Sequence, residues 1–229
     1  MKSMYKTLKK HTKLPWKKNN AEDFKYCFFF SFDIYNKRPD KTMSSFRGFI
    51  AIDLSATPKI LEFENALTKI GADVKLVEPE NIHITLKFLG DVEQHTIDPI
   101  DQIMNDAVHD MNPFTFTLKR TGVFPNQQYM KIIWIGIENE QPIITLAKIL
   151  DEQLCTLGFT KEKREFSPHL TIGRVRTAKN KEQLLQTIQT YSDTLFGEFF
   201  VDSITLKKSD LTIKGPIYTT IKKASFPTR

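Results

Sequence analysis

The chain has 229 residues, of which 40% are hydrophobic, and its formal net charge is +6. This length and composition are enough for one domain with a substantial core, or for two small lobes. A disulfide scaffold and a structural zinc site are both excluded, because Cys27 and Cys155 are isolated and form no CxxC pair. A reduced, cytoplasmic setting is therefore expected.

The positive charge belongs to the N-terminal region. Residues 1–42 hold 11 lysines and arginines against 4 acidic residues, whereas residues 43–229 hold 22 against 23. The net charge is thus no evidence that the larger part binds RNA. The apolar run at residues 27–32 is too short to cross a bilayer and is not a signal peptide, so no membrane partner is expected.

Met43 opens the stretch in which the first strand begins. We therefore interpret residues 1–42 as a basic N-terminal extension, poorly ordered or upstream of the native start, and residues 43–229 as the functional domain. The alternative is a basic, aromatic arm that grips RNA by charge and by stacking.

Hydrophobic periodicity and turn residues predict alternating strands and helices from residue 47 onward. Thr57 and Pro58 begin the first helix and Gly71 ends it, while Gly158 ends the third. The pattern predicts an α+β fold of two lobes, at about residues 47–112 and 113–229, in which helices cover mixed, mainly antiparallel sheets. The expected strands are 49–53, 74–77, 82–89, 114–118, 131–137, 170–175, 199–207 and 217–222, and the expected helices are 57–70, 97–110, 143–157 and 181–191.

One short pattern occurs twice: His83-Ile84-Thr85-Leu86 returns as His169-Leu170-Thr171-Ile172. In a strand, alternation places the histidine and threonine on one face and the two apolar residues on the other. A single copy is most simply a strand with a solvated polar face. Two copies, each shortly preceded by a proline, instead predict that two imidazoles and two hydroxyls meet at an active site.

These residue types suit acid-base chemistry. Imidazole has an unperturbed pKa of about 6.5, so one histidine can remove a proton while the other supplies one. Threonine hydroxyls can donate to phosphate oxygens. The motifs contain no carboxylate, whereas divalent-metal phosphodiesterases generally hold their ions with Asp or Glu alongside His. There is also no glycine-rich phosphate loop. We therefore expect neither a metal nor a cofactor.

Five stretches together carry a resemblance to a known family. They are residues 47–52, 79–92 around His83, 122–125, 133–136 and 166–176 around His169. In this order they resemble the 2H phosphoesterase superfamily, and specifically the RNA 2',3'-cyclic phosphodiesterases once called 2'-5' RNA ligases. The resemblance implies two lobes related by a pseudo-two-fold axis, with the motif strands facing each other across a central cleft.

The resemblance also implies roles for single residues. His83 would be the proton donor and His169 the proton acceptor, while Thr85, Thr171 and Arg174 would bind the phosphate. Strict alternation puts Arg174 on the face opposite His169, so either a bulge at the preceding glycine re-aims it or it reaches round the strand end. Lys87 shares the face of His83 by alternation and is predicted either to line the cleft or to lie at its rim.

The predicted function is hydrolysis of RNA 2',3'-cyclic phosphate to a 2'-phosphate end by a metal-independent, two-histidine mechanism. The partner would be RNA or a nucleotide with a 2',3'-cyclic phosphate end, and the protein would act as a monomer. Within the family, the alternatives are 2'-5' RNA ligation and cleavage of small cyclic or 2'-5'-linked nucleotides. A non-catalytic RNA-binding module is the alternative from a different class, although a mere binder would not need two titrating groups.

Overall fold

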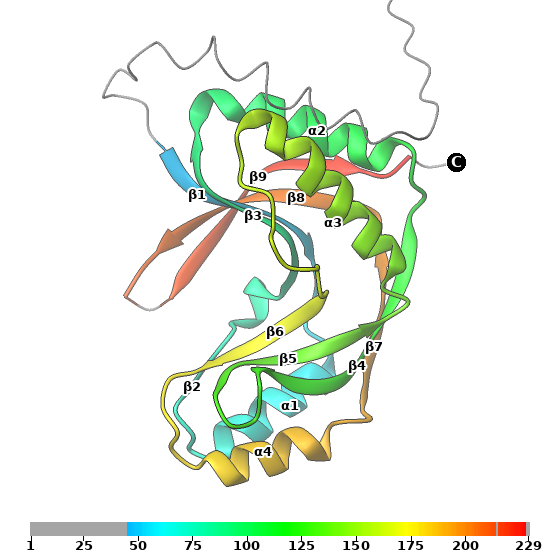
Figure 1. The fold of residues 1–229 in the computed structure, drawn as a ribbon. Coiled ribbons are helices and arrows are strands. Elements are labelled where there is room, and N and C mark those ends of the chain that lie inside the picture. The colour runs from blue at the N-terminus through cyan, green and yellow to red at the C-terminus, as the bar shows by residue number, and fades with distance from the viewer. Residues whose placement is uncertain (1–44, 214, 228–229) are drawn as a thin grey trace, which may run out of the picture. The chain divides into compact units, whose positions relative to one another are not determined.

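Residues 45–213 and 215–227 are described by a computed structural model, and Figure 1 shows their arrangement. They form two antiparallel sheets. The strands are β1 (Ser45–Asp53), β2 (Val74–Leu76), β3 (His83–Glu93), β4 (Phe114–Pro125), β5 (Met130–Glu138), β6 (His169–Val175), β7 (Leu195–Val201), β8 (Ser203–Leu211) and β9 (Pro216–Ser225). The helices are α1 (Pro58–Lys69), α2 (Ile97–His109), α3 (Gln141–Leu154) and α4 (Lys181–Thr190).

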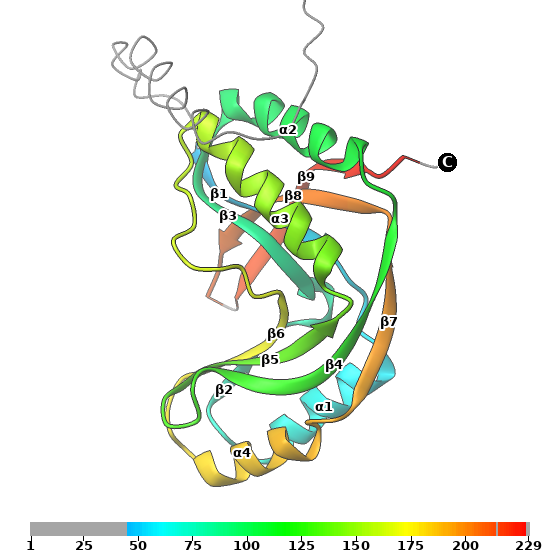
Figure 2. The same cartoon turned by 45° about the vertical axis from the view of Figure 1, so that its right-hand side comes forward.

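The four-stranded sheet has the order β3-β1-β8-β9, and the five-stranded sheet has the order β2-β6-β5-β4-β7. Helices α2 and α3 pack on the first sheet, and α1 and α4 lie on the outer side of the strongly curved second sheet (Figures 1 and 2). Motif strands β3 and β6 contact each other although they belong to different sheets. The α+β class expected from the sequence is confirmed.

Local signals explain where the helices begin and end. The Thr57 hydroxyl accepts a hydrogen bond from the backbone N–H of Ile60 at 3.2 Å, and Pro58 occupies the first turn of α1. Gly158, with φ of 88°, follows the 3₁₀ turn that extends α3, in the left-handed conformation that glycine adopts without strain. The apolar positions of α2 that face the core recur at helical spacing: Ile97, Ile100, Met104, Ala107 and Val108.

The late strands differ from the expectation. A single strand was expected at 199–207, but Asp202 separates β7, in the five-stranded sheet, from β8, in the four-stranded sheet. In addition, β2 lies in the sheet that is otherwise built from later residues. The two sheets therefore exchange strands across the expected lobe boundary at residues 112 and 113. Pairing partners about 100 or more residues apart decide this exchange, and local periodicity contains no information about them.

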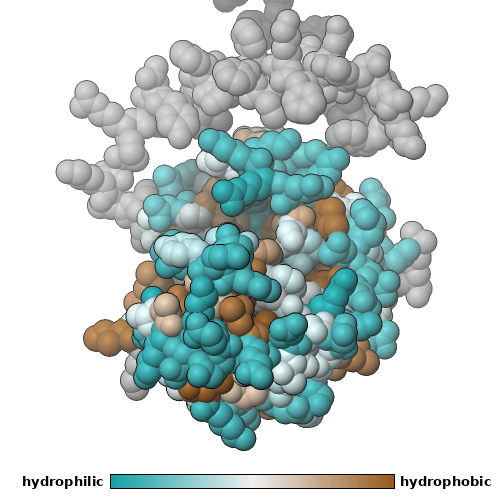
Figure 3. Space-filling view, turned by 60° about the horizontal axis from the view of Figure 1, so that its bottom comes forward, coloured by the Kyte–Doolittle hydropathy of each residue, from teal (hydrophilic) through white to brown (hydrophobic). Residues whose placement is uncertain are grey.

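Hydrophilic residues cover most of the face that includes α1 and α4, and hydrophobic side chains form smaller, separate areas on it (Figure 3). No helix among residues 45–213 and 215–227 combines the length and apolar character that a bilayer crossing requires. The basic extension at residues 1–42 and the proposed start at Met43 lie outside the described residues.

Helix α1 contains one carboxyl group in an unfavourable place. Glu64 is only 7% exposed, and its Oε1 has no hydrogen-bond partner among the described residues. Burial, reinforced by the nearby negative charge of Glu78, raises the pKa of the Glu64 carboxyl to about 7. At neutral pH and above, ionisation of this group therefore opposes folding.

Glu64→Gln should therefore stabilise the protein in a pH-dependent way. The pKa of Glu64 is higher in the folded protein than in the unfolded chain. Glu64 therefore does not lower the free energy of unfolding below about pH 4.5, whereas its ionisation lowers this free energy as the pH rises through 7. We expect the variant to exceed the native protein by up to about 3 kcal/mol at pH 8 and by little at pH 4.5. Urea unfolding at the two pH values measures this, and an equal difference at both would contradict it.

Candidate active site

His83 opens β3, and the alternation expected for its motif is present: Ile84 and Leu86 are buried, whereas His83 and Thr85 are partly exposed. The imidazole is held at both ring nitrogens. Nδ1 lies 2.7 Å from the backbone carbonyl oxygen of Asn81, and Nε2 lies 3.1 Å from the Thr85 hydroxyl. The carbonyl can only accept, so in the neutral ring Nδ1 carries the hydrogen and Nε2 is the basic nitrogen.

His169 opens β6 in the same way. Its Nδ1 lies 2.8 Å from the carbonyl oxygen of Ser167, which is again the second residue before the histidine. The Phe124 ring meets the imidazole edge to face, with a centroid distance of 5.0 Å. Both motifs thus fix the same tautomer by the same contact and leave Nε2 for proton transfer.

The surroundings of the histidines favour the neutral imidazole. Burial lowers the pKa of His83 and of His169 below the usual value of 6.5. The carbonyl contacts oppose this effect in both cases, and the charge of Asp53 raises the pKa of His83 further. The charges of Lys207 and Arg174 lower the pKa of His83, so two cations lie near this ring.

A β-bulge re-aims Arg174. Gly173 pairs with Ile133 and Thr171 pairs with Trp134, so Ile172 is an extra residue in β6. Ile172 and Gly173 are consequently both buried, and Arg174 is exposed. The Arg174 charge lowers the pKa of Tyr218 as well as that of His83, which places the guanidinium beside the first motif. Of the two explanations offered for Arg174, a bulge is present, but its extra residue is Ile172 and not the glycine that follows it.

The first motif strand has a bulge at the equivalent position. Lys87 pairs with Ile50 and Thr85 pairs with Ala51, so Leu86 is the extra residue. Lys87 is 2% exposed and Phe88 is 64% exposed. Phe88 therefore corresponds to Arg174, five residues after its histidine and on the same face. Unbroken alternation would put Phe88 on the face opposite His83, so this position could not be expected from the sequence.

The same bulge moves Lys87 out of the cleft. Both predictions for this residue, lining the cleft or lying at its rim, are wrong. Its Nζ is 2.6 Å from Asp151 Oδ1 and donates to the carbonyl oxygen of Thr160, also at 2.6 Å. Glu162 lies further away, at 3.8 Å. Lys87 thus connects β3 to α3 and to the loop that leads to His169.

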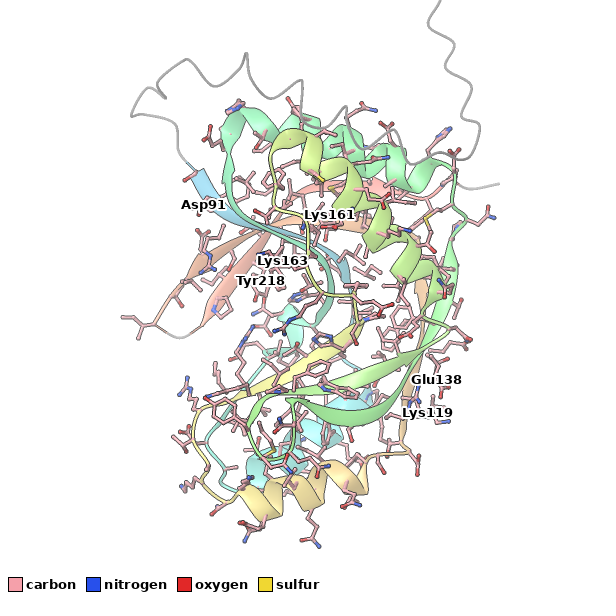
Figure 4. The ribbon with its side chains drawn as sticks, viewed as in Figure 1. Asp91, Lys119, Glu138, Lys161, Lys163 and Tyr218 are labelled. Atoms are coloured by element: carbon pink, nitrogen blue, oxygen red, sulfur yellow. The ribbon has the colours of Figure 1, made fainter. Side chains whose placement is uncertain are left out.

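Strands β1 and β9 add aromatic side chains beside His83 that were not predicted from the sequence. Tyr218, labelled on β9 in Figure 4, has its ring 5.3 Å from the His83 imidazole. Phe49 lies 5.0 Å from the imidazole, 4.9 Å from the Tyr218 ring and 6.4 Å from the Phe88 ring. Phe49, Phe88 and Tyr218 form an aromatic cluster beside the first histidine.

Asp53 is the β1 residue that pairs with His83. Its carboxylate binds Lys207 Nζ at 2.9 Å and accepts a hydrogen bond from the Thr205 hydroxyl at 3.2 Å. Lys207 is therefore held next to the first motif by a fixed anion. With Arg174, it makes the surroundings of His83 suitable for a phosphate.

The remaining histidines of the described chain do not join the site. His95 lies near Glu93, with Nδ1 3.2 Å from the carboxylate, and His109 ends α2. No group of three or more His, Cys, Asp and Glu side chains within the described ranges is arranged to hold a metal ion. Metal independence itself stays a prediction.

The family model described as the 2'-5' RNA ligase superfamily matches residues 62–212. The chain belongs to this superfamily. It is 44% identical, over 77% of its length and 99% of the relative, to an RNA 2',3'-cyclic phosphodiesterase of Methanocaldococcus jannaschii. A relative of the same name from Methanothermobacter thermautotrophicus is 37% identical over 76% of this chain and 95% of its own.

Solved structures of other proteins share the fold. The chain is similar to a Thermus thermophilus protein with a TM-score of 0.63 and 25% identity, over 79% of this chain and 97% of the other. It is also similar to E. coli LigT complexed with 3'-AMP, with a TM-score of 0.61 and 23% identity over 81% of this chain and 100% of LigT. These two solved structures therefore have the same fold as this chain.

Proposed function

We propose that this protein hydrolyses RNA 2',3'-cyclic phosphate ends to 2'-phosphate ends. The observation that carries the proposal is the matched pair of histidines, each opening a motif strand and each tied through Nδ1 to the carbonyl two residues before it. The names of the curated relatives support the same activity. RNA or a nucleotide with a 2',3'-cyclic phosphate is the proposed substrate, and action as a cytoplasmic monomer stays a prediction.

The proposed mechanism gives the two histidines different tasks. His169, as the neutral imidazole, accepts a proton from water at Nε2. His83, as the protonated imidazolium, gives its Nε2 proton to the departing ribose 3'-oxygen. Water attacks in line with the bond that breaks, so base and acid act from opposite sides of the phosphorus. The phosphate remains on the 2'-oxygen.

The phosphate contacts follow from the same arrangement. Thr85 and Thr171 would donate hydrogen bonds to the non-bridging oxygens, and Arg174 would neutralise their charge. The aromatic cluster of Phe49, Phe88 and Tyr218 would receive the base of the terminal nucleotide. Phe88 offers an exposed ring for stacking, an interaction that tolerates any base.

The decisive experiment is incubation with a 2',3'-cyclic mononucleotide, with and without a chelator, followed by phosphorus NMR of the product. We expect full turnover after thorough chelation, because two imidazoles and neutral donors complete the proton transfers, and we expect only the 2'-phosphate. Loss of activity that Mg²⁺, Mn²⁺ or Zn²⁺ restores would reject the metal-free mechanism. A 3'-phosphate product would instead reverse the assignment of the histidines.

A further inference from the structure

The loop at residues 158–168 holds the second histidine of the candidate site. It leads from the end of α3 to β6, and Lys161 and Lys163 are labelled on it in Figure 4. Near its end, Ser167 supplies the carbonyl oxygen that lies 2.8 Å from Nδ1 of His169. The position of this loop therefore affects how the His169 ring is held and where its Nε2 points.

Two hydrogen bonds to other elements hold the first part of this loop. Residues 162–165 are exposed, and no backbone–backbone hydrogen bond of the described chain includes them. Just before them, the carbonyl oxygen of Thr160 accepts a hydrogen bond from Lys87 Nζ at 2.6 Å. The backbone N–H of Glu162 donates to Asp151 Oδ1 at 3.1 Å. A segment with so few backbone contacts opens easily, so these two bonds matter for its position.

The two bonds come from the two ends of one ion pair. Lys87 and Asp151 have side chains that are 1% and 15% exposed, and Nζ lies 2.6 Å from Oδ1. Lys87 belongs to β3, four residues after His83, the residue with which this strand begins. Apolar residues of similar size often replace a buried ion pair without loss of stability, but they cannot bind backbone groups. This pair connects the strand of the first histidine to the loop that holds the second.

We infer that Lys87, through its ion pair with Asp151, is a positioning residue that sets the placement of His169 relative to His83. This inference rests on the proposed function, in which base and acid act from opposite sides of one phosphorus atom. Lys87 acts indirectly, because its ammonium group contacts α3 and the loop. A misplacement of the base on the order of 1 Å can lower kcat by about 100-fold, whereas substrate binding uses other side chains.

A double variant, Lys87→Met with Asp151→Leu, separates positioning from stability. It leaves neither charge of the pair without its partner, so its urea midpoint should return from that of Lys87→Met toward the native value. We expect kcat on a 2',3'-cyclic mononucleotide to stay at least about 10-fold below the native value, with KM within about 2-fold of it. Recovery of kcat together with the midpoint would overturn the inference.

Lys59→Met with Glu62→Leu is the matched control for the double variant. It also removes a lysine-carboxylate pair at 2.6 Å, but one on the exposed surface of α1. This control should keep the native kcat. A loss of kcat as large as that of the Lys87 and Asp151 double variant would contradict the inference, because the effect would then not be specific to the pair that holds the loop.

Proline substitution tests the same connection from the exposed side of the loop. Glu162→Pro removes the N–H that donates to Asp151 and leaves the ion pair with Lys87 in place. We expect kcat to fall at least about 3-fold at an unchanged urea midpoint. Because the core is not altered, this variant decides the question even if the double variant stays unstable.

Glu165→Pro is the matched control for this proline variant. It lies in the same loop, but its backbone N–H forms no hydrogen bond with any other described residue. Its kcat should equal that of the native protein. Equal kcat values in Glu162→Pro and Glu165→Pro would contradict the inference.

The imidazole gives a readout that does not require turnover. Long-range proton–nitrogen NMR spectra report which ring nitrogen carries the hydrogen in a neutral histidine. In the double variant and in Glu162→Pro, His169 should lose part of its preference for hydrogen on Nδ1, because Ser167 moves with the loop. His83, held by Asn81, should keep its preference. Unchanged His169 signals in both variants would overturn the inference. A native protein without turnover would reject the proposed function, and these spectra would still decide whether Lys87 positions His169.

Discussion

His83→Ala and His169→Ala are each expected to lower kcat on a 2',3'-cyclic mononucleotide by at least about 100-fold, because each removes one of two proton-transfer groups. Folding should change little, since both side chains are partly exposed at the start of their strands. The measurement is kcat at saturating substrate, with thermal unfolding as the check on folding.

His95→Ala is the matched control for these variants. His95 is also a histidine, but its side chain is 59% exposed and lies near Glu93, away from the motifs. It should retain full activity. Near-normal turnover of either His83→Ala or His169→Ala would reject the two-histidine mechanism, and an equal loss in His95→Ala would point to a non-specific effect of the substitution.

Lys87→Met is expected to lower the free energy of unfolding by about 3 to 5 kcal/mol, the usual cost of breaking a buried ion pair from one side. The Lys87 side chain is 1% exposed and that of Asp151 is 15% exposed, with 2.6 Å between Nζ and Oδ1. Methionine preserves most of the apolar stem but leaves the Asp151 carboxylate and the Thr160 carbonyl oxygen without their ammonium partner. Urea denaturation of the two proteins gives the difference.

Lys59→Met serves as the matched control for the Lys87 variant. Lys59 and Glu62 are also 2.6 Å apart, but their side chains are 44% and 52% exposed. Solvent screens this pair, so its loss should have only a small effect on stability. A similar loss of free energy of unfolding in the two variants would show that burial does not explain the contribution of the Lys87 ion pair to stability.

Features with local causes could be predicted from the amino-acid sequence alone. Thr57 and Pro58 set the start of α1, and Gly158 closes the end of α3, because capping depends on residues within one or two turns. The alternation of His83, Ile84, Thr85 and Leu86 likewise followed from the geometry of a strand. These signals were enough to predict an α+β fold and to select both histidines.

Other features depend on how distant strands pair. The bulges at Leu86 and Ile172 arise where neighbouring strands pair with β3 and β6, and they move Lys87 into the core and turn Phe88 and Arg174 toward the histidine face. Tyr218 reaches His83 because β9, more than 100 residues later in the chain, joins the sheet through β8. Periodicity reports which face a residue occupies within an unbroken strand. It contains no information about where a partner strand interrupts the register or which distant strand arrives beside it, because those outcomes depend on long-range pairing and packing.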